Sequence, residues 1–74
     1  MYLPRLAEWR WRRALSQREV ATRAGLAAAT VNRVENGLQP ARPSTVRKLA
    51  DALGVTPDDL MGPDVLRASF NGKD

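Results

Sequence analysis

The stretch LSQREVATRAGLAAATVNRVENG, residues 15–37, decides how this chain folds. Ser16, followed three residues later by Glu19, is the signature of a capping box, which predicts a helix over Gln17–Ala24. Gly25 is expected to end that helix, because glycine readily adopts the positive φ that a turn after a helix requires. The first half of the stretch therefore predicts a short helix followed by a tight turn.

A second short helix is predicted directly after this turn, over Ala28–Asn36, with Gly37 in the left-handed closing position. Val31 and Val34 lie three residues apart and are expected to face the preceding helix, where the small side chain of Ala21 permits close approach. Two short helices joined in this way form a helix-turn-helix. Taken alone, the pair favours DNA binding over a plain helical hairpin.

The N-terminal flank predicts a helix from Pro4 to about Ala14, since proline suits the first turn of a helix. Leu6, Trp9 and Arg10 share one face of this helix. This flank therefore supplies a first helix that packs on the helix-turn-helix.

Trp11 lies about 200° around this predicted helix from Trp9, so it needs a different partner. Three alternatives remain open: apolar side chains of the C-terminal stretch DVLRASF, residues 64–70, cover it within the chain; it makes a subunit contact; or it stacks on a ligand. Packing within the chain is the favoured alternative.

Two more helices are expected after the proline-rich segment LQPARP, residues 38–43. Ser44 or Thr45 is expected to cap the first of them, and Gly54 to stop it. Apolar residues recur in it at three- and four-residue spacing: Val46, Leu49, Ala50 and Leu53. A short fifth helix is expected to end near residues 61–62. With no strand pattern, the sequence predicts an all-α, compact five-helix bundle with a central helix-turn-helix.

Composition narrows the class of function. The chain has no cysteine and no histidine, so disulfides, thiolate or imidazole metal sites and the usual general base are excluded. Asp58, Asp59 and Asp64 are expected to be helix-start carboxylates rather than metal ligands. We therefore expect no enzymatic activity, no metal and no cofactor. No segment approaches the about 20 apolar residues of a membrane span, and a soluble cytoplasmic protein is expected.

Charge is distributed unevenly along the chain. The net charge is +4, but residues 1–48 carry +7 and residues 49–74 carry −3. Nearly all the cations of the first part are arginines, whose planar forks suit phosphates and guanine edges. The basic part therefore fits a nucleic-acid partner, although an ordinary arginine-rich surface would give the same composition.

The stretch 15–37, together with RPSTVRKLADALGVTPDDL, residues 42–60, closely resembles the Cro/CI-type helix-turn-helix family of phage and bacterial repressors, also called the xenobiotic-response-element family. The resemblance covers roughly residues 5–61. It implies a lambda-repressor-like DNA-binding domain over residues 1–62, in which helix 28–36 enters the major groove. Residues 63–74 are then a tail, expected to be a short helix for packing or dimerisation.

The resemblance also implies which residues hold the DNA backbone. The phosphate-contacting set is Gln17, Arg18, Asn36, Gly37, Arg42, Ser44 and Thr45. Helix N-termini and turn amides are anion sites, which makes this set physically reasonable. The resemblance further implies an ion pair between Arg10 and Glu35 that braces the first helix against the third; the alternative is two unrelated surface charges.

The recognition helix departs from the family pattern, because Ala27 and the two residues after it occupy the cap and the first base-facing positions. The base-reading set is Ala28, Ala29, Thr30, Asn32 and Arg33. Alanine methyl groups can pack on thymine methyl groups while the polar side chains contact guanine or adenine. Alternatively, DNA shape supplies the specificity, or base reading is lost and the scaffold binds a protein. We expect a mixture of the first two.

The sequence therefore predicts a DNA-binding transcriptional regulator, a repressor in its simplest action. We expect a homodimer on a near-palindromic operator, with half-sites about one helical turn apart. The alternative is a protein-interaction module on the same scaffold, an antitoxin-like or anti-repressor partner.

Overall fold

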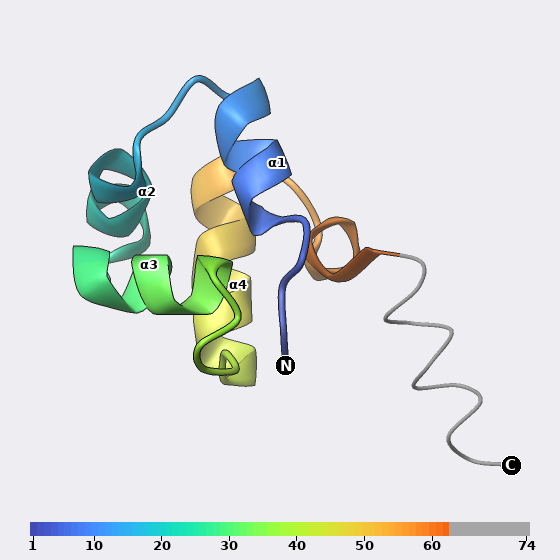
Figure 1. Ribbon diagram of the computed structural model, residues 1–74. Coiled ribbons are helices and arrows are strands. Elements are labelled where there is room, and N and C mark those ends of the chain that lie inside the picture. The colour runs from blue at the N-terminus through green and yellow to red at the C-terminus, as the bar shows by residue number, and fades with distance from the viewer. Residues whose placement is uncertain (63–74) are drawn as a thin grey trace, which may run out of the picture.

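The computed structural model describes residues 1–62, which form a bundle of short helices without a strand (Figure 1). Four of the helices are α1 (Leu6–Arg12), α2 (Gln17–Ala24), α3 (Ala28–Glu35) and α4 (Pro43–Leu53). Residues 57–62 are helical as well. The predicted all-α fold with five helices is confirmed. The predicted tail, residues 63–74, lies outside the described residues.

The core of the bundle forms where α2 packs against both α3 and α4. It consists of aliphatic side chains from every helix: Leu3, Leu6, Leu15, Val20, Ala21, Ala24, Val31, Val34, Ala41, Val46, Leu49, Ala50, Leu53 and Leu60. In Figure 1, α2 and α3 lie together at one edge of the bundle, and the helical segment 57–62 lies at the opposite edge. The helix-turn-helix therefore has one face on the core and one face open.

Four helix boundaries differ from the sequence prediction, and the end of α1 is described with the turn that follows it. Helix α1 begins at Leu6, two residues beyond Pro4, and α3 ends one residue early, so that Asn36 is its cap. Helix α4 begins at Pro43, and neither Ser44 nor Thr45 caps it. A proline is favoured at the first position of a helix because its missing N–H would have no partner there, so Pro43 begins α4 before either hydroxyl residue is reached.

The turn between α1 and α2 depends on a left-handed alanine. Ala14 has φ of 56°, and its N–H donates to the Trp11 carbonyl at 3.0 Å. The following N–H, of Leu15, donates to the Arg10 carbonyl at 3.1 Å, so the pair closes the end of α1. A left-handed conformation costs a residue with a side chain about 1–2 kcal/mol. The predicted continuation of the helix to residue 14 was wrong because the chain reverses here.

Replacing Ala14 with glycine should raise the free energy of unfolding by about 0.5–1 kcal/mol, because glycine adopts positive φ without strain. Part of the relief is offset by the greater freedom of glycine in the unfolded chain. Urea unfolding measures the effect. The control is Ala7→Gly, within α1, which should lower stability by about 1 kcal/mol. A loss of stability in both variants would contradict this account of the turn.

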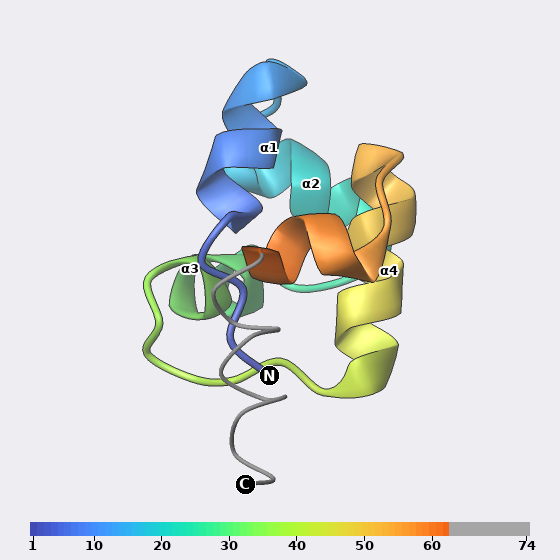
Figure 2. The ribbon, with the colours of Figure 1, turned by 90° about the vertical axis from the view of Figure 1, so that its right-hand side faces the viewer.

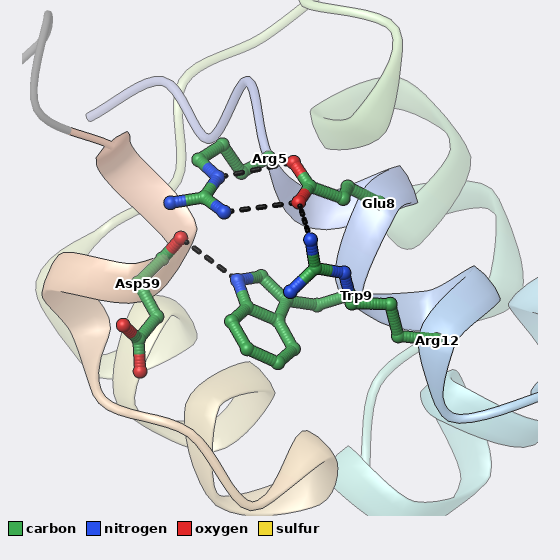
Figure 3. A network of polar contacts seen from close by, with 5 residues as sticks. All are labelled: Arg5, Glu8, Trp9, Arg12 and Asp59. Carbon is green, nitrogen blue, oxygen red and sulfur yellow. Dashed lines mark hydrogen bonds and ion pairs between the residues drawn. The ribbon is translucent and has the colours of Figure 1, made fainter.

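One contact of the polar network in Figure 3 joins helix α1 to the segment 57–62. The indole N–H of Trp9 donates to the Asp59 carbonyl at 3.0 Å. Glu8 accepts two hydrogen bonds from Arg5 and pairs with Arg12 at 2.8 Å. The Arg12 guanidinium also lies 4.9 Å from the centre of the Trp9 ring. Hydrogen bonding by Arg5 holds the pKa of Glu8 below its ordinary value. The Arg5, Glu8 and Arg12 contacts therefore stabilise α1 itself, and the Trp9 hydrogen bond holds it to residues 57–62.

Candidate nucleic-acid interface

The open face of α3 carries the base-reading set. Ala28, Ala29, Asn32 and Arg33 are exposed, and Thr30 is partly exposed. Val31 and Val34 are buried on the opposite side of the same helix. Because residues three and four apart share a helix face, the buried valines anchor α3 while the other side faces solvent. The structure therefore brings the predicted base-reading residues onto one accessible surface.

Helix α3 begins without a side-chain cap. Ala27 has the extended backbone of an N-cap residue, with φ of −74° and ψ of 143°, but its methyl group accepts no hydrogen bond. The carbonyl of Ala27 accepts from the N–H groups of Thr30 and Val31. Relative to serine or threonine, the missing acceptor costs about 0.5–2 kcal/mol. The first N–H groups of α3 thus remain on the exposed front of the helix.

The start of α2 is organised by the predicted capping box. The Ser16 hydroxyl accepts from the Glu19 N–H at 3.0 Å, and the Glu19 carboxylate accepts from the Ser16 N–H at 2.9 Å. The Ser16 backbone hydrogen bond is the main reason that the pKa of Glu19 lies below its ordinary value. The box fixes the first turn of α2, on which Gln17 is partly exposed and Arg18 exposed. Helix starts of this kind suit anions.

The segment between α3 and α4 holds the remaining phosphate candidates. Gly37 has φ of 72° and turns the chain away from α3. The loop is held by the N-terminal segment, since the Ala41 N–H donates to the Met1 carbonyl at 2.6 Å and the Met1 amino group donates to the Ala41 carbonyl at 2.9 Å. In Figure 2 the N-terminal segment passes between α3 and residues 57–62. Around this loop Arg42 and Ser44 are exposed.

Arg10 and Glu35 form a two-pronged ion pair between α1 and α3. The Nε and Nη2 atoms of Arg10 donate to the two carboxylate oxygens at 2.9 and 2.8 Å, and Nη1 donates to the Leu15 carbonyl at 3.1 Å. The side chains are only 11% and 8% exposed. Burial raises the pKa of Glu35, but hydrogen bonds from Arg10 and Gln17 and the charge of Arg10 bring it below its ordinary value. The two residues that the family resemblance pairs are therefore in contact.

A second polar contact joins α2 to α3 and is not predicted from the sequence. The Asn32 side-chain amide donates to the Gln17 carbonyl oxygen at 3.1 Å. The two residues lie 15 positions apart, and the apolar pattern indicates only that their helices approach each other. The contact depends on the crossing of the two helices, which no local signal in the sequence reports. A predicted base reader and a predicted phosphate contact thus touch each other.

Trp11 is exposed in the described part of the chain, with 72% of its surface accessible. The Arg10 guanidinium lies 5.2 Å from the centre of its ring. Trp11 lines a hollow of about 440 Å³ together with Arg10, Ala14, Leu15 and Ser16. The stretch 64–70, which the sequence offers as its cover, lies outside the described residues.

The predicted helix-start role of Asp59 is visible at the segment 57–62. Its carboxylate accepts from the Thr56 N–H at 3.0 Å, and its own N–H donates to the Thr56 hydroxyl at 3.3 Å. The Thr56 backbone hydrogen bond is the main cause of the lowered pKa of Asp59.

Among residues 1–62 no cluster of acidic side chains is placed to hold a metal ion. Asp64 lies outside the described residues. Within the same range, no helix is long and apolar enough to cross a bilayer.

Comparison with known families and curated proteins identifies similar chains. The family described as "Helix-turn-helix domain" matches residues 4–61. The HTH-type transcriptional repressor RghR of Bacillus subtilis (strain 168) is 40% identical over 50 residues, which cover 66% of this chain and 37% of RghR. This chain therefore spans little more than a third of the length of that relative.

Solved structures show the same arrangement of helices. The restriction-modification controller protein C.AhdI from Aeromonas hydrophila is 38% identical, with a TM-score of 0.74 over 76% of this chain and 85% of C.AhdI. The hypothetical transcription factor NHTF from Neisseria is 31% identical, with a TM-score of 0.74 over 88% of this chain and 75% of NHTF. A chain in the structure of the SinR protein/SinI protein complex is 20% identical, with a TM-score of 0.75 over 97% of this chain and 81% of that chain. At this identity the similarity supports only the fold.

Proposed function

This chain belongs to the Cro/CI-type helix-turn-helix family, and from that membership we propose that it is a transcriptional regulator that binds double-stranded DNA in a sequence-specific manner. The main observation behind this proposal is that α3 has one buried side and one exposed side. Val31 and Val34 fix the helix to the core, while Ala28, Asn32 and Arg33 remain on its exposed side. We propose that this exposed side enters the major groove, which is wide enough for an α-helix.

Backbone contacts would orient α3 in the groove. The start of α2, with Gln17 and Arg18, and the segment Arg42–Thr45 before and within the first turn of α4 flank α3 in the chain. Phosphate contacts fix the register of a protein on DNA without reading its sequence. The arginines supply the electrostatic attraction, and the helix starts supply N–H donors. We propose that these two segments hold the backbone on either side of the groove, together with the turn at Asn36 and Gly37.

Base reading would then depend on few groups. Ala28 and Ala29 present methyl groups suited to thymine methyls, and Arg33 presents a fork suited to guanine. Because the alanines form no hydrogen bonds through their side chains, sequence-dependent DNA shape would supply part of the specificity. We propose that two copies of the chain bind a near-palindromic operator and repress transcription by occluding a promoter. The similarity to a transcriptional repressor supports this direction of regulation.

Selection of binding sites from random duplexes tests this function. Arg33→Ala should reduce the preference for the selected site over random DNA about ten- to a hundred-fold, the cost of removing one two-pronged interaction with guanine. The matched control is Arg23→Ala, an exposed arginine on α2 that lines a hollow with Asp51 and Gly54. It should select the same site as the wild type. Failure of the wild type to enrich any sequence would contradict specific binding.

A further inference from the structure

We propose that Asn32 is a positioning residue, which holds the side chain of Gln17 so that its amide hydrogens face a DNA phosphate. The proposal rests on the function proposed above and goes beyond the base-reading role that the sequence suggests for Asn32. The observation behind it is the hydrogen bond of 3.1 Å from the Asn32 amide nitrogen to the Gln17 carbonyl oxygen.

The direction of this hydrogen bond determines which end of the Gln17 amide stays available. The Asn32 amide nitrogen donates, and the Gln17 carbonyl oxygen accepts. The Gln17 NH₂ group, which can only donate, is therefore not used in this contact. Asn32 on α3 thus holds Gln17 on α2 by its carbonyl end.

The contact with Asn32 leaves the NH₂ group of Gln17 for a ligand. Asn32 engages only the carbonyl oxygen, so the two hydrogens of the NH₂ group can donate at the start of α2. The terminal torsion of a glutamine side chain is broad when nothing holds it. Asn32 holds the carbonyl end and so fixes the direction of the free N–H before any ligand arrives. A preoriented donor loses less entropy on binding.

A base-reading residue and a positioning residue have different effects on DNA affinity. A base reader affects only sequences that carry its base, whereas a positioned phosphate donor affects every sequence. Gln17 and Asn32 are neutral and release no counterions, so their replacement should lower affinity equally at all salt concentrations and leave the salt slope unchanged.

A double-mutant cycle on a random-sequence duplex, measured by fluorescence anisotropy over a range of salt, tests the proposal. Asn32→Ala and Gln17→Ala should each weaken binding about five-fold, the value of one hydrogen bond. The double variant should be no weaker than Gln17→Ala, because Asn32 acts through Gln17. The control is Thr22→Ala, an exposed residue of α2, with unchanged affinity. Thermal unfolding checks that the wild type and all four variants are folded at the temperature of the binding measurement.

The outcomes distinguish this proposal from the function on which it rests. If Asn32→Ala binds the random duplex as tightly as the wild type, or if the two effects add, Asn32 does not position Gln17. If the wild type itself shows no salt-dependent binding to the duplex, the proposed function fails and this role fails with it.

Discussion

Glu35→Gln should lower the free energy of unfolding by about 3 kcal/mol, since it leaves the nearly buried Arg10 guanidinium without its charge partner. A small domain has a total stability of about 5 kcal/mol, so the variant should unfold at markedly lower urea concentration. The reason is geometric: two hydrogen bonds join Arg10 to the carboxylate, and the pair fixes α3 against α1. Urea unfolding followed by circular dichroism measures the loss.

The control for this prediction is a double-mutant cycle on Arg10 and Glu35. Arg10→Met should cost a similar amount, but Arg10→Met combined with Glu35→Leu should be less destabilising than the two single losses added, because no buried charge is left unpaired. Additive losses would show that the two side chains do not stabilise each other. Arg12→Met, on a side chain that is 55% exposed, should change stability little.

The effect of Glu35 should depend on pH in a defined direction. Because its pKa in the folded protein lies below the ordinary value, the folded carboxylate stays ionised at lower pH than the unfolded one. Its stabilisation is therefore complete above about pH 5 and is lost as the pH falls through the folded pKa. The difference in stability between wild type and Glu35→Gln should shrink as the pH falls below about 4. A difference that grows on acidification would contradict this assignment.

Affinity for a random-sequence duplex should fall about a hundred-fold between about 50 and about 200 mM salt. The value follows if Arg18 and Arg42 each neutralise one phosphate in both halves of a dimer, because each neutralised phosphate releases counterions. Fluorescence anisotropy of a labelled duplex measures the slope of log affinity against log salt. A flat dependence would exclude binding through phosphates.

The salt slope also identifies which arginines touch the backbone. Arg18→Gln and Arg42→Gln should each make the slope shallower, by about 1 for each phosphate that is no longer neutralised. Arg12→Gln is the matched control, because Arg12 pairs with Glu8 in the network beside residues 57–62 and lies outside the proposed interface. Equal changes in all three variants would assign the salt dependence to net charge alone.

The sequence predicts the helices and their buried faces because these follow from local patterns. The Ser16 and Glu19 capping box and the Val31 and Val34 spacing each need only a few neighbouring residues, and the structure places both as expected. The predicted start of α4 was wrong because Pro43 competes with the hydroxyl residues that follow it, and local preferences alone did not rank the two signals.

Contacts between helices are less accessible to sequence reasoning. The Arg10 and Glu35 contact was expected only through a family resemblance, and the Asn32 and Gln17 contact was not expected at all. Both depend on how α2 and α3 cross and on which rotamers meet there, and neither property is encoded in a short window. The left-handed Ala14 is likewise not predicted from a short window, because alanine by itself favours continuing a helix.

If the exposed side of α3 lies in the major groove, the amide resonances of α3 should respond most strongly to DNA. On titration with the duplex recovered by site selection, the largest chemical-shift changes should fall on Ala28–Arg33 of α3 and on Gln17 and Arg18 at the start of α2. Residues 57–62, at the opposite edge of the bundle, should shift least. Shifts concentrated on residues 57–62, with α3 unchanged, would mean that α3 does not enter the groove.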